Sequence, residues 1–276
     1  MRDLSSLFTV TFLLCLFFFQ PLNEASASRA IEVQLKNNSG KPVENIKLYG
    51  GSYALLIGVS DYTSGWPSLE SIPKELAQVE TLLQSKGFTV EKYENPDSRK
   101  LERVFDDFID KYGYEPENRL LFYYAGHGYT RKDGEKGYLV PVDAPNPLKD
   151  DRGFVRKALN MNRLVSMARD IEAKHALFLF DSCFSGTIFK QRDLPKPSKY
   201  ITSLTTQPVR LFITAGKAGE TVPAESTFTP AFIDGIKHSL ADFNKDGYVS
   251  GTELGQYLQE NVPKYADQNP QFGKIR

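Results

Sequence analysis

Short apolar runs alternate with amphipathic segments along this chain, and that alternation restricts the fold more than any other feature. The runs that predict strands are 52–59, 88–93, 119–124, 175–180 and 209–214. Several of them are apolar almost throughout, which is typical of strands covered on both faces. Apolar residues at helical spacing predict helices over 72–86, 98–112 and 160–172. Strands alternating with helices indicate an α/β fold with a mostly parallel sheet.

Weaker signals predict further elements around this pattern. They are a leading strand at 30–35, a turn-rich linker at 37–42, a hairpin around 137–141, and helices near 229–240 and 252–260. We expect helices on both faces of the sheet, since parallel strands need crossover connections.

The start of the chain has the pattern of a secretory signal peptide, predicted over residues 1–27. Arg2 precedes an apolar run at 7–19, and Ala25-Ser-Ala27 supplies a small-residue cleavage site. Cleavage after Ala27 predicts a secreted or periplasmic protein with no stable membrane insertion. The alternative is a membrane anchor through 7–19, although a span needs about 20 apolar residues. Residues 28–50 would then be an extension or linker before a domain at 51–276.

Charge and motif patterns exclude several function classes. The chain has 34 basic and 34 acidic residues and a net charge of +0, so nothing favours a nucleic-acid or anionic-membrane partner. No Cys/His cluster has zinc-ligand spacing, and no glycine-rich phosphate loop follows a strand.

His127 and Cys183 are the strongest candidates for chemistry. Each lies just after a predicted buried strand, and functional groups collect past the carboxyl ends of parallel strands. If the two strands are neighbours, the imidazole can activate the thiol as a nucleophile. The other cysteine, Cys15, lies in the predicted signal peptide, so Cys183 would be the single mature thiol. The alternative is a buried structural cysteine, but Ser182 and Gly186 favour a turn.

These segments resemble those of the caspase-like cysteine peptidases, the caspase, metacaspase and bacterial orthocaspase group. The matching pieces are Ala54–Tyr62, Tyr124–Gly128 and Asp181–Gly186, in the family's order. Asp-Ser stands before the cysteine where the animal enzymes have Gln-Ala, which indicates the metacaspase-like branch. The resemblance implies a caspase-like three-layer sandwich and a cysteine endopeptidase that acts on protein or peptide substrates.

The resemblance also implies roles for individual residues. Cys183 would be the nucleophile and His127 the general base and acid, with no cofactor required for the chemistry. The backbone N–H groups of Gly128 and Cys183 would form the oxyanion hole, where glycine permits close approach of a carbonyl. Asp181 and Glu75 would bind an Arg or Lys side chain of the substrate. The alternatives are an Asp181 bonded to backbone amides and a solvated Glu75 on a helix face.

The segment 242–253 matches the EF-hand loop pattern, with oxygen-bearing residues at alternate positions and Gly247 at the turn. The candidate Ca²⁺ ligands are Asp242, Asn244, Asp246, Tyr248 and Glu253. The alternative is an Asx-type turn followed by an N-capped helix. A catalytically silent caspase-fold protein, binding a partner or Ca²⁺, is the alternative function.

An exposed connector is predicted at 187–208, where prolines alternate with basic residues. An enzyme that cleaves after basic residues would find a cut site there, so self-cleavage is expected within 190–199. The alternative is an enzyme that works as one uncut chain.

Overall fold

The computed structural model describes residues 31–36, 42–131, 136–182, 208–216 and 225–275. Cys183, the predicted signal peptide and nearly all of the predicted connector lie outside the described residues. Among the described residues, no helix combines the length and the apolar character needed to cross a bilayer.

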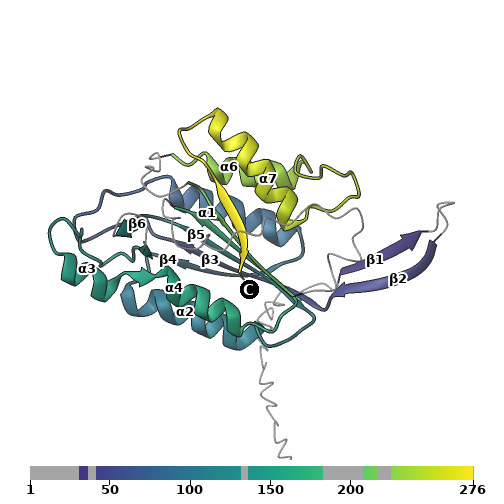
Figure 1. Ribbon diagram of the computed structural model, residues 1–276, viewed down its shortest axis with the longest axis horizontal. Helices are drawn as coiled ribbons and strands as arrows, with labels where there is room; N and C mark the ends of the chain where they lie inside the picture. Colours follow the sequence, from purple (N-terminus) through teal and green to yellow (C-terminus); the bar gives the residue numbers. More distant parts are fainter. Residues whose placement is uncertain (1–30, 37–41, 132–135, 183–207, 217–224, 276) are drawn as a thin grey trace, which may run out of the picture.

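A six-stranded sheet forms the centre of the protein, with the strand order β11-β10-β9-β5-β3-β4 (Figure 1). Its strands are β3 (Gly51–Gly58), β4 (Thr89–Glu94), β5 (Asn118–Ala125), β9 (His175–Asp181), β10 (Val209–Thr214) and β11 (Gln271–Ile275). Neighbours run parallel except at the edge, where β11 pairs antiparallel with β10. The predicted runs supply every parallel strand, so the expected mostly parallel sheet is confirmed.

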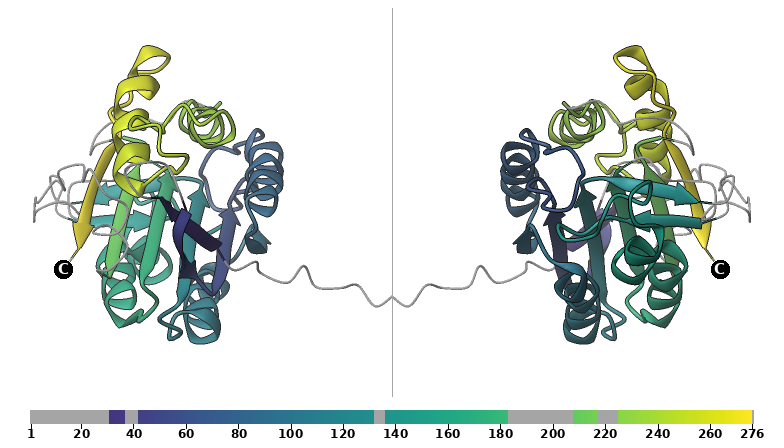
Figure 2. Two further views of the ribbon diagram at one scale, coloured as in Figure 1. Left: turned by 90° about the vertical axis from the view of Figure 1, so that its right-hand side faces the viewer. Right: turned by 90° about the vertical axis from the view of Figure 1, so that its left-hand side faces the viewer.

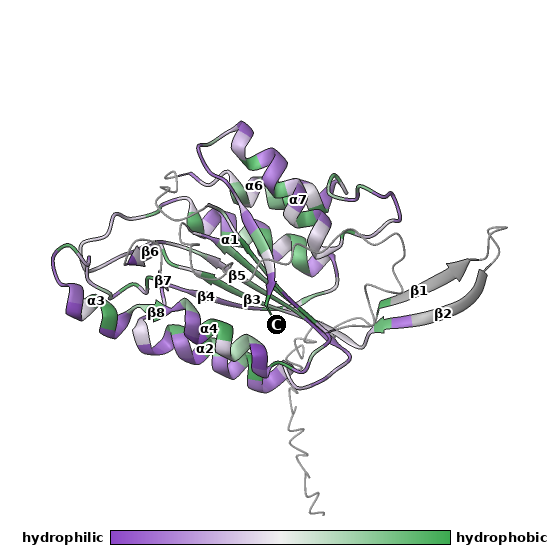
Figure 3. Cartoon of the chain, in the orientation of Figure 1, coloured by the Kyte–Doolittle hydropathy of each residue, from purple (hydrophilic) through white to green (hydrophobic). Residues whose placement is uncertain are grey.

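Helices cover both faces of the sheet, which confirms the three-layer α/β arrangement (Figures 1 and 2). One layer contains α1 (Ile72–Ser85), α6 (Phe228–Lys237) and α7 (Gly251–Asn261). The other contains α2 (Ser98–Tyr112) and α4 (Met161–Asp170). Figure 3 shows apolar residues along the strands and polar residues on the outer helix faces, as two-sided burial of the sheet requires.

A row of three phenylalanines crosses the sheet and joins its central strands. Phe122, Phe178 and Phe212 occupy paired positions of β5, β9 and β10. Their ring centroids lie 4.3 Å and 4.4 Å apart along the row, and all three rings are buried. Phe108 of α2 contacts the end of this row edge-on. Because strand residues alternate between faces, Tyr123 points to the opposite layer, where it stacks on a phenylalanine of α6.

Several elements were not predicted from the sequence. Part of the expected linker is strand β2 (Pro42–Tyr49), which forms a hairpin with β1 (Ile31–Lys36). A small sheet contains β6 (Gly128–Arg131), β7 (Lys136–Leu139) and β8 (Leu159–Asn160), and its first two strands confirm the expected hairpin. The remaining additions are strand β11, helix α3 (Asp151–Lys157) and the 3₁₀ turn η1 (Val262–Lys264).

Candidate active site

The strand register places the two predicted catalytic segments side by side. β5 and β9 are parallel neighbours, with Ala125 opposite Asp181. His127 and Cys183 each follow two residues later in the chain. The expectation that these strands are neighbours is therefore confirmed. The structure describes the chain up to Ser182, so the position of Cys183 itself stays a prediction.

The backbone before His127 is held by a tyrosine of a neighbouring loop. The His127 N–H donates to the Tyr62 hydroxyl over 2.7 Å. A Cβ atom at Gly126 would lie 2.7 Å from the Tyr124 hydroxyl and 2.9 Å from that of Tyr62. Glycine is therefore required before the histidine, because no larger residue permits this approach.

The His127 ring has a defined tautomer. Its Nε2 lies 2.8 Å from the backbone carbonyl oxygen of Pro67. Because a carbonyl can only accept, Nε2 carries the proton and Nδ1 keeps its lone pair. Burial lowers the pKa of His127, and the ring lies against Trp66 and Tyr62, with centroids 5.1 Å and 4.7 Å away. A neutral imidazole with one free nitrogen is suited to accept a proton from a thiol.

The hairpin register bears on the direction of the Gly128 N–H group. Val140 donates its N–H to the carbonyl of His127, whereas the His127 N–H donates to Tyr62. Hydrogen-bonded and non-bonded pairs alternate along an antiparallel ladder. The next pair, Gly128 with Leu139, is therefore of the non-bonded kind. In a non-bonded pair the N–H faces away from the partner strand, and the role of Gly128 as an oxyanion donor stays a prediction.

Asp181 is a buried carboxylate, with 3% of the residue exposed. Its Oδ2 accepts hydrogen bonds from the hydroxyls of Ser226 and Thr229, the latter over 2.6 Å. Its Oδ1 is buried and accepts no hydrogen bond from the described residues. Burial is the main cause that raises the pKa of Asp181 to about 6, against the lowering effect of the two hydroxyls. The nearby charge of Glu75 raises it further.

Glu75, in the first turn of α1, is also buried, with 8% of the residue exposed. It lies near Asp181, since Ser226 donates its hydroxyl to Asp181 and its N–H to Glu75 Oε1, while its role in substrate binding stays a prediction. The alternative of a solvated helix face is wrong. Glu75 Oε2 is buried and has no partner among the described residues. Burial raises the pKa of Glu75, and the charge of Glu225 adds to this effect.

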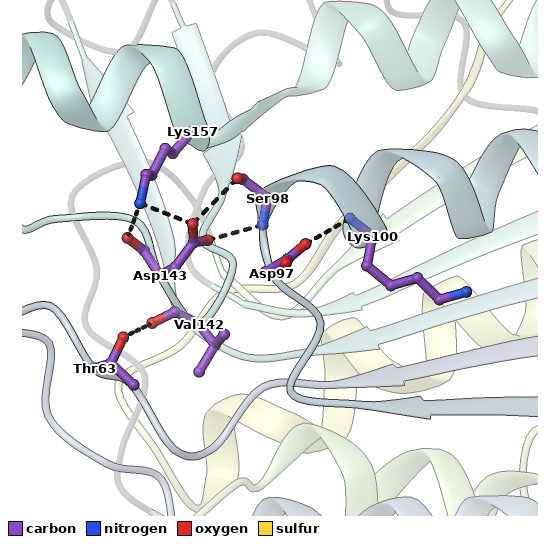
Figure 4. Close-up of polar contacts among 7 residues, drawn as sticks. All are labelled: Thr63, Asp97, Ser98, Lys100, Val142, Asp143 and Lys157. Atoms are coloured by element: carbon purple, nitrogen blue, oxygen red, sulfur yellow. Dashed lines mark hydrogen bonds and ion pairs between the residues drawn. The ribbon is translucent and has the colours of Figure 1, made fainter.

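A polar network supports the loop that carries Tyr62 and Pro67 (Figure 4). Asp143 accepts from the N–H of Ser98 at the start of α2 over 2.8 Å, and pairs with Lys157 at the end of α3 over 2.8 Å. The adjacent Val142 carbonyl accepts from both the N–H and the hydroxyl of Thr63, over 3.0 Å and 3.1 Å. These bonds fix the histidine-contacting loop against two helix ends.

The sequence analysis identified neither Pro67 nor Ser226. Pro67 contributes a backbone carbonyl, which any residue type could supply, so the residue type at this position gives no signal. Ser226 lies in a polar segment before α6 where serine is common in any case. The contact of Tyr62 with the His127 N–H had a weak signal in the sequence, because Tyr62 is the last residue of the first segment that resembles the family.

The predicted Ca²⁺ loop is folded around its own side chains. Asp242 accepts from the N–H groups of Asp246 and Gly247, and Asn244 and Asp246 accept from residues two further on. Glu253 and Ser250 form a reciprocal capping box at the start of α7. No group of three or more acidic, histidine or cysteine residues in the described part of the chain is arranged to hold a metal ion. These bonds fit the Asx-turn alternative, and Ca²⁺ binding, with Tyr248 among its ligands, stays a prediction.

The comparison with family models finds one that covers most of the chain. The caspase domain model matches residues 52–273. Two curated relatives are the mouse and human mucosa-associated lymphoid tissue lymphoma translocation protein 1. The mouse protein is 28% identical over 151 residues, which are 54% of this chain and 16% of that protein. The human protein is 29% identical over 133 residues, 47% of this chain and 15% of that protein. This chain therefore spans only about a sixth of these relatives.

Solved structures with the same fold include the Drosophila initiator caspase Dronc. It has a TM-score of 0.55 and 12% identity, with 81% of this chain and 79% of that chain covered. A protein from Geobacter sulfurreducens has a TM-score of 0.54 and 15% identity, with 81% and 93% covered. These likenesses support the fold, while the match of the domain model shows the family. The chain, in which His127 follows strand β5 and Asp181 ends strand β9, belongs to the caspase domain family.

Proposed function

We propose that this protein is an exported cysteine endopeptidase that uses His127 and Cys183 and cleaves after Arg or Lys. The observation that carries the proposal is the pair of buried carboxylates, Asp181 and Glu75, at the edge of the sheet that holds His127. Each of them keeps one buried oxygen without a partner among the described residues. Two carboxylates in one site disfavour each other's ionisation unless a cation joins them.

The arrangement around His127 supports a defined sequence of proton transfers. His127 Nδ1 would take the proton of the Cys183 thiol, and the sulfur would attack the carbonyl carbon of the scissile peptide. The Gly128 and Cys183 N–H groups would stabilise the oxyanion. The imidazolium then gives its proton to the leaving amine as the C–N bond breaks, which leaves a thioester. Water, deprotonated by His127, adds to the thioester carbonyl and releases Cys183.

Specificity follows from the unpaired carboxylate oxygens. A guanidinium or ammonium group would supply the missing donors and neutralise the pair, whereas an acidic side chain would add a third like charge. Arg is expected to be preferred over Lys if both carboxylates are used at once, since its planar fork has donors on two sides.

The test uses matched peptide substrates that differ at the cleaved position only, with Arg, Lys, citrulline or Asp. Citrulline keeps the shape of Arg and removes its charge. We expect the Arg and Lys peptides to be cleaved and kcat/KM to fall at least about 100-fold with citrulline, which corresponds to the loss of about one hydrogen bond to a charged group. Cys183→Ala and His127→Ala should each abolish turnover while keeping the fold. Full activity in either variant would refute the catalytic pair, and preference for Asp would refute the pocket. Inactivity of the wild type on every peptide would support the silent alternative.

A further inference from the structure

A cavity lies at the amino end of the sheet, opposite the edge that carries His127. Its lining includes residues at the start of three strands, Arg119 of β5, His175 of β9 and Val209 of β10. Its volume is about 250 Å³. The chain from 244 to 253, which leads into α7, closes one side. Because it opens at the opposite edge of the sheet, an occupant would not touch the proposed catalytic residues.

Most of the cavity wall is apolar. Leu48, Leu177, Val209, Leu211 and Val249 contribute to it from three strands and a loop. Apolar cavities with a few polar groups are the usual form of small-molecule sites, which are commonly about 300–1,000 Å³. This cavity is slightly smaller than that range, so it suits a short acyl or aryl group.

One cation in the wall has no anionic partner. The Arg119 guanidinium lies between the rings of Phe88 and Tyr49, 4.4 Å and 5.2 Å from their centroids. Its Nε donates to the Ser52 hydroxyl over 2.9 Å, and an Nη group makes a long contact of 3.5 Å to the Lys86 carbonyl. No carboxylate of the described residues pairs with it. Burial lowers the pKa of Arg119 to about 10, and only Tyr49 opposes that effect.

The aromatic rings compensate only part of the cost of burying this charge. A cation–π contact contributes about 0.5–2 kcal/mol, whereas removing a charge from water costs several kcal/mol. Tyr49 is itself held in place, because its hydroxyl bonds to His175 Nδ1 over 2.6 Å. The guanidinium is therefore fixed in orientation and leaves donors for an additional acceptor.

Charges elsewhere in the wall support an anion at the Arg119 end. Lys274 of β11 contributes a second cation from the edge of the sheet. Asp246 and Glu253 also line the cavity, but their oxygens accept N–H groups of their own loop. The cavity thus has carboxylates that bond to their own loop on one side. On the other it has apolar surface and two cations, Arg119 and Lys274, for which no ion pair occurs among the described residues.

We propose that this cavity binds a small amphipathic carboxylate, with its carboxylate on Arg119 and its apolar chain against Leu177, Val209 and Leu211. A planar guanidinium with free donors matches a carboxylate in geometry and charge. The apolar chain would lie between these strand residues and the start of α7, which also lines the cavity. The test of this site does not depend on the proposed peptidase activity, because it measures binding alone.

Octanoate is the probe, with octanol and octylamine as chain-matched controls, added to the full-length Cys183→Ala protein. Ligand binding to the native state raises the melting temperature. At about 10 mM we expect octanoate to raise it by roughly 2–4 °C. Octanol and octylamine should give less than half of this shift. Isothermal titration should show that octanol binds at least about tenfold more weakly than octanoate, as expected for the loss of one charge-assisted hydrogen bond.

Two variants locate the site. Arg119→Gln removes the charge and should weaken octanoate binding at least about tenfold while leaving octanol binding unchanged. Val209→Phe fills the apolar end and should weaken binding of both. If Arg119→Gln does not fold, two measurements still test the proposal. They are the comparison of octanoate with octanol in the parent protein and the effect of Val209→Phe. No octanoate binding at 10 mM, equal binding of octanol, or octanoate binding unaffected by Val209→Phe would each overturn the proposal.

Discussion

Asp181→Asn is expected to make the protein more stable while removing its proposed function. The pKa of Asp181, about 6, lies roughly two above the value of 3.8 for a free aspartic acid side chain. At 1.36 kcal/mol for each pKa unit, its ionisation costs the folded protein about 3 kcal/mol at a pH above both values. Asparagine removes that cost. Its amide oxygen can still accept from Ser226 and Thr229, and its amide group can donate toward Glu75.

The raised pKa of Asp181 also determines how the stability difference between the variant and its parent changes with pH. The raised pKa means that the folded state holds the proton more tightly than the unfolded state does. The contribution of protonated Asp181 to stability is therefore complete below pH 3.8 and is lost as the pH rises through about 6. The stability difference between asparagine variant and parent should be about 3 kcal/mol at pH 8 and should approach zero near pH 4.

Urea unfolding of the variant and its parent, both carrying Cys183→Ala, measures this difference at several pH values. Asp170→Asn, at the exposed end of α4, serves as the matched control and should change stability by less than about 0.5 kcal/mol at any pH. In the active background, Asp181→Asn should lose cleavage of Arg peptides. An asparagine variant that is less stable than its parent at pH 8, or a difference independent of pH, would refute the reasoning.

Four further predictions concern other parts of the molecule. Ser226→Ala removes a donor to the Asp181 carboxylate, so the acid limb of the pH profile of kcat/KM on Arg peptides should move up by about one pH unit; an unchanged limb would contradict the contact. Phe178→Ala, in the middle of the phenylalanine row, should lower the free energy of unfolding by about 3–5 kcal/mol in urea titrations, and a loss below about 1 kcal/mol would mean that the row relaxes freely. Millimolar Ca²⁺, but not Mg²⁺, should raise the melting temperature through the 242–253 loop with a Kd of roughly 10⁻⁴–10⁻³ M, an effect absent in Asp242→Asn; calorimetry without heat would exclude it. The wild type, unlike Cys183→Ala, should acquire new N-termini within 190–199 by mass spectrometry, and equal cuts in both would indicate a contaminating protease.

The central parallel strands could be predicted because β3, β5 and β9 are buried along most of their length, which leaves apolar runs in the sequence. Strand β11 gave no such run, because Gln271 to Ile275 lies at the edge of the sheet and mixes polar, apolar and glycine residues. Its identity as a strand depends on pairing with β10, which is a tertiary contact. Strand β2 was not predicted for a similar reason, since it depends on pairing with β1.

The candidate site was predictable where chemistry requires a particular side chain. His127, Asp181 and Glu75 are of this kind, and the structure places the last two beside one serine. The support around them could not be predicted. Pro67 acts through a carbonyl that every residue has, and Ser226 acts through its position, which depends on how the segment before α6 meets α1.

The phenylalanine row has a consequence for a chain cut between β9 and β10. These two strands pair in parallel over six positions, and Phe178 stacks on Phe212 across them. After a cut at 190–199, this packing would be the principal joint between the two pieces, with α6 adding contacts to α1. The protein would then unfold as a heterodimer. Its melting temperature would rise with protein concentration, and separately produced halves would reconstitute one site from two chains.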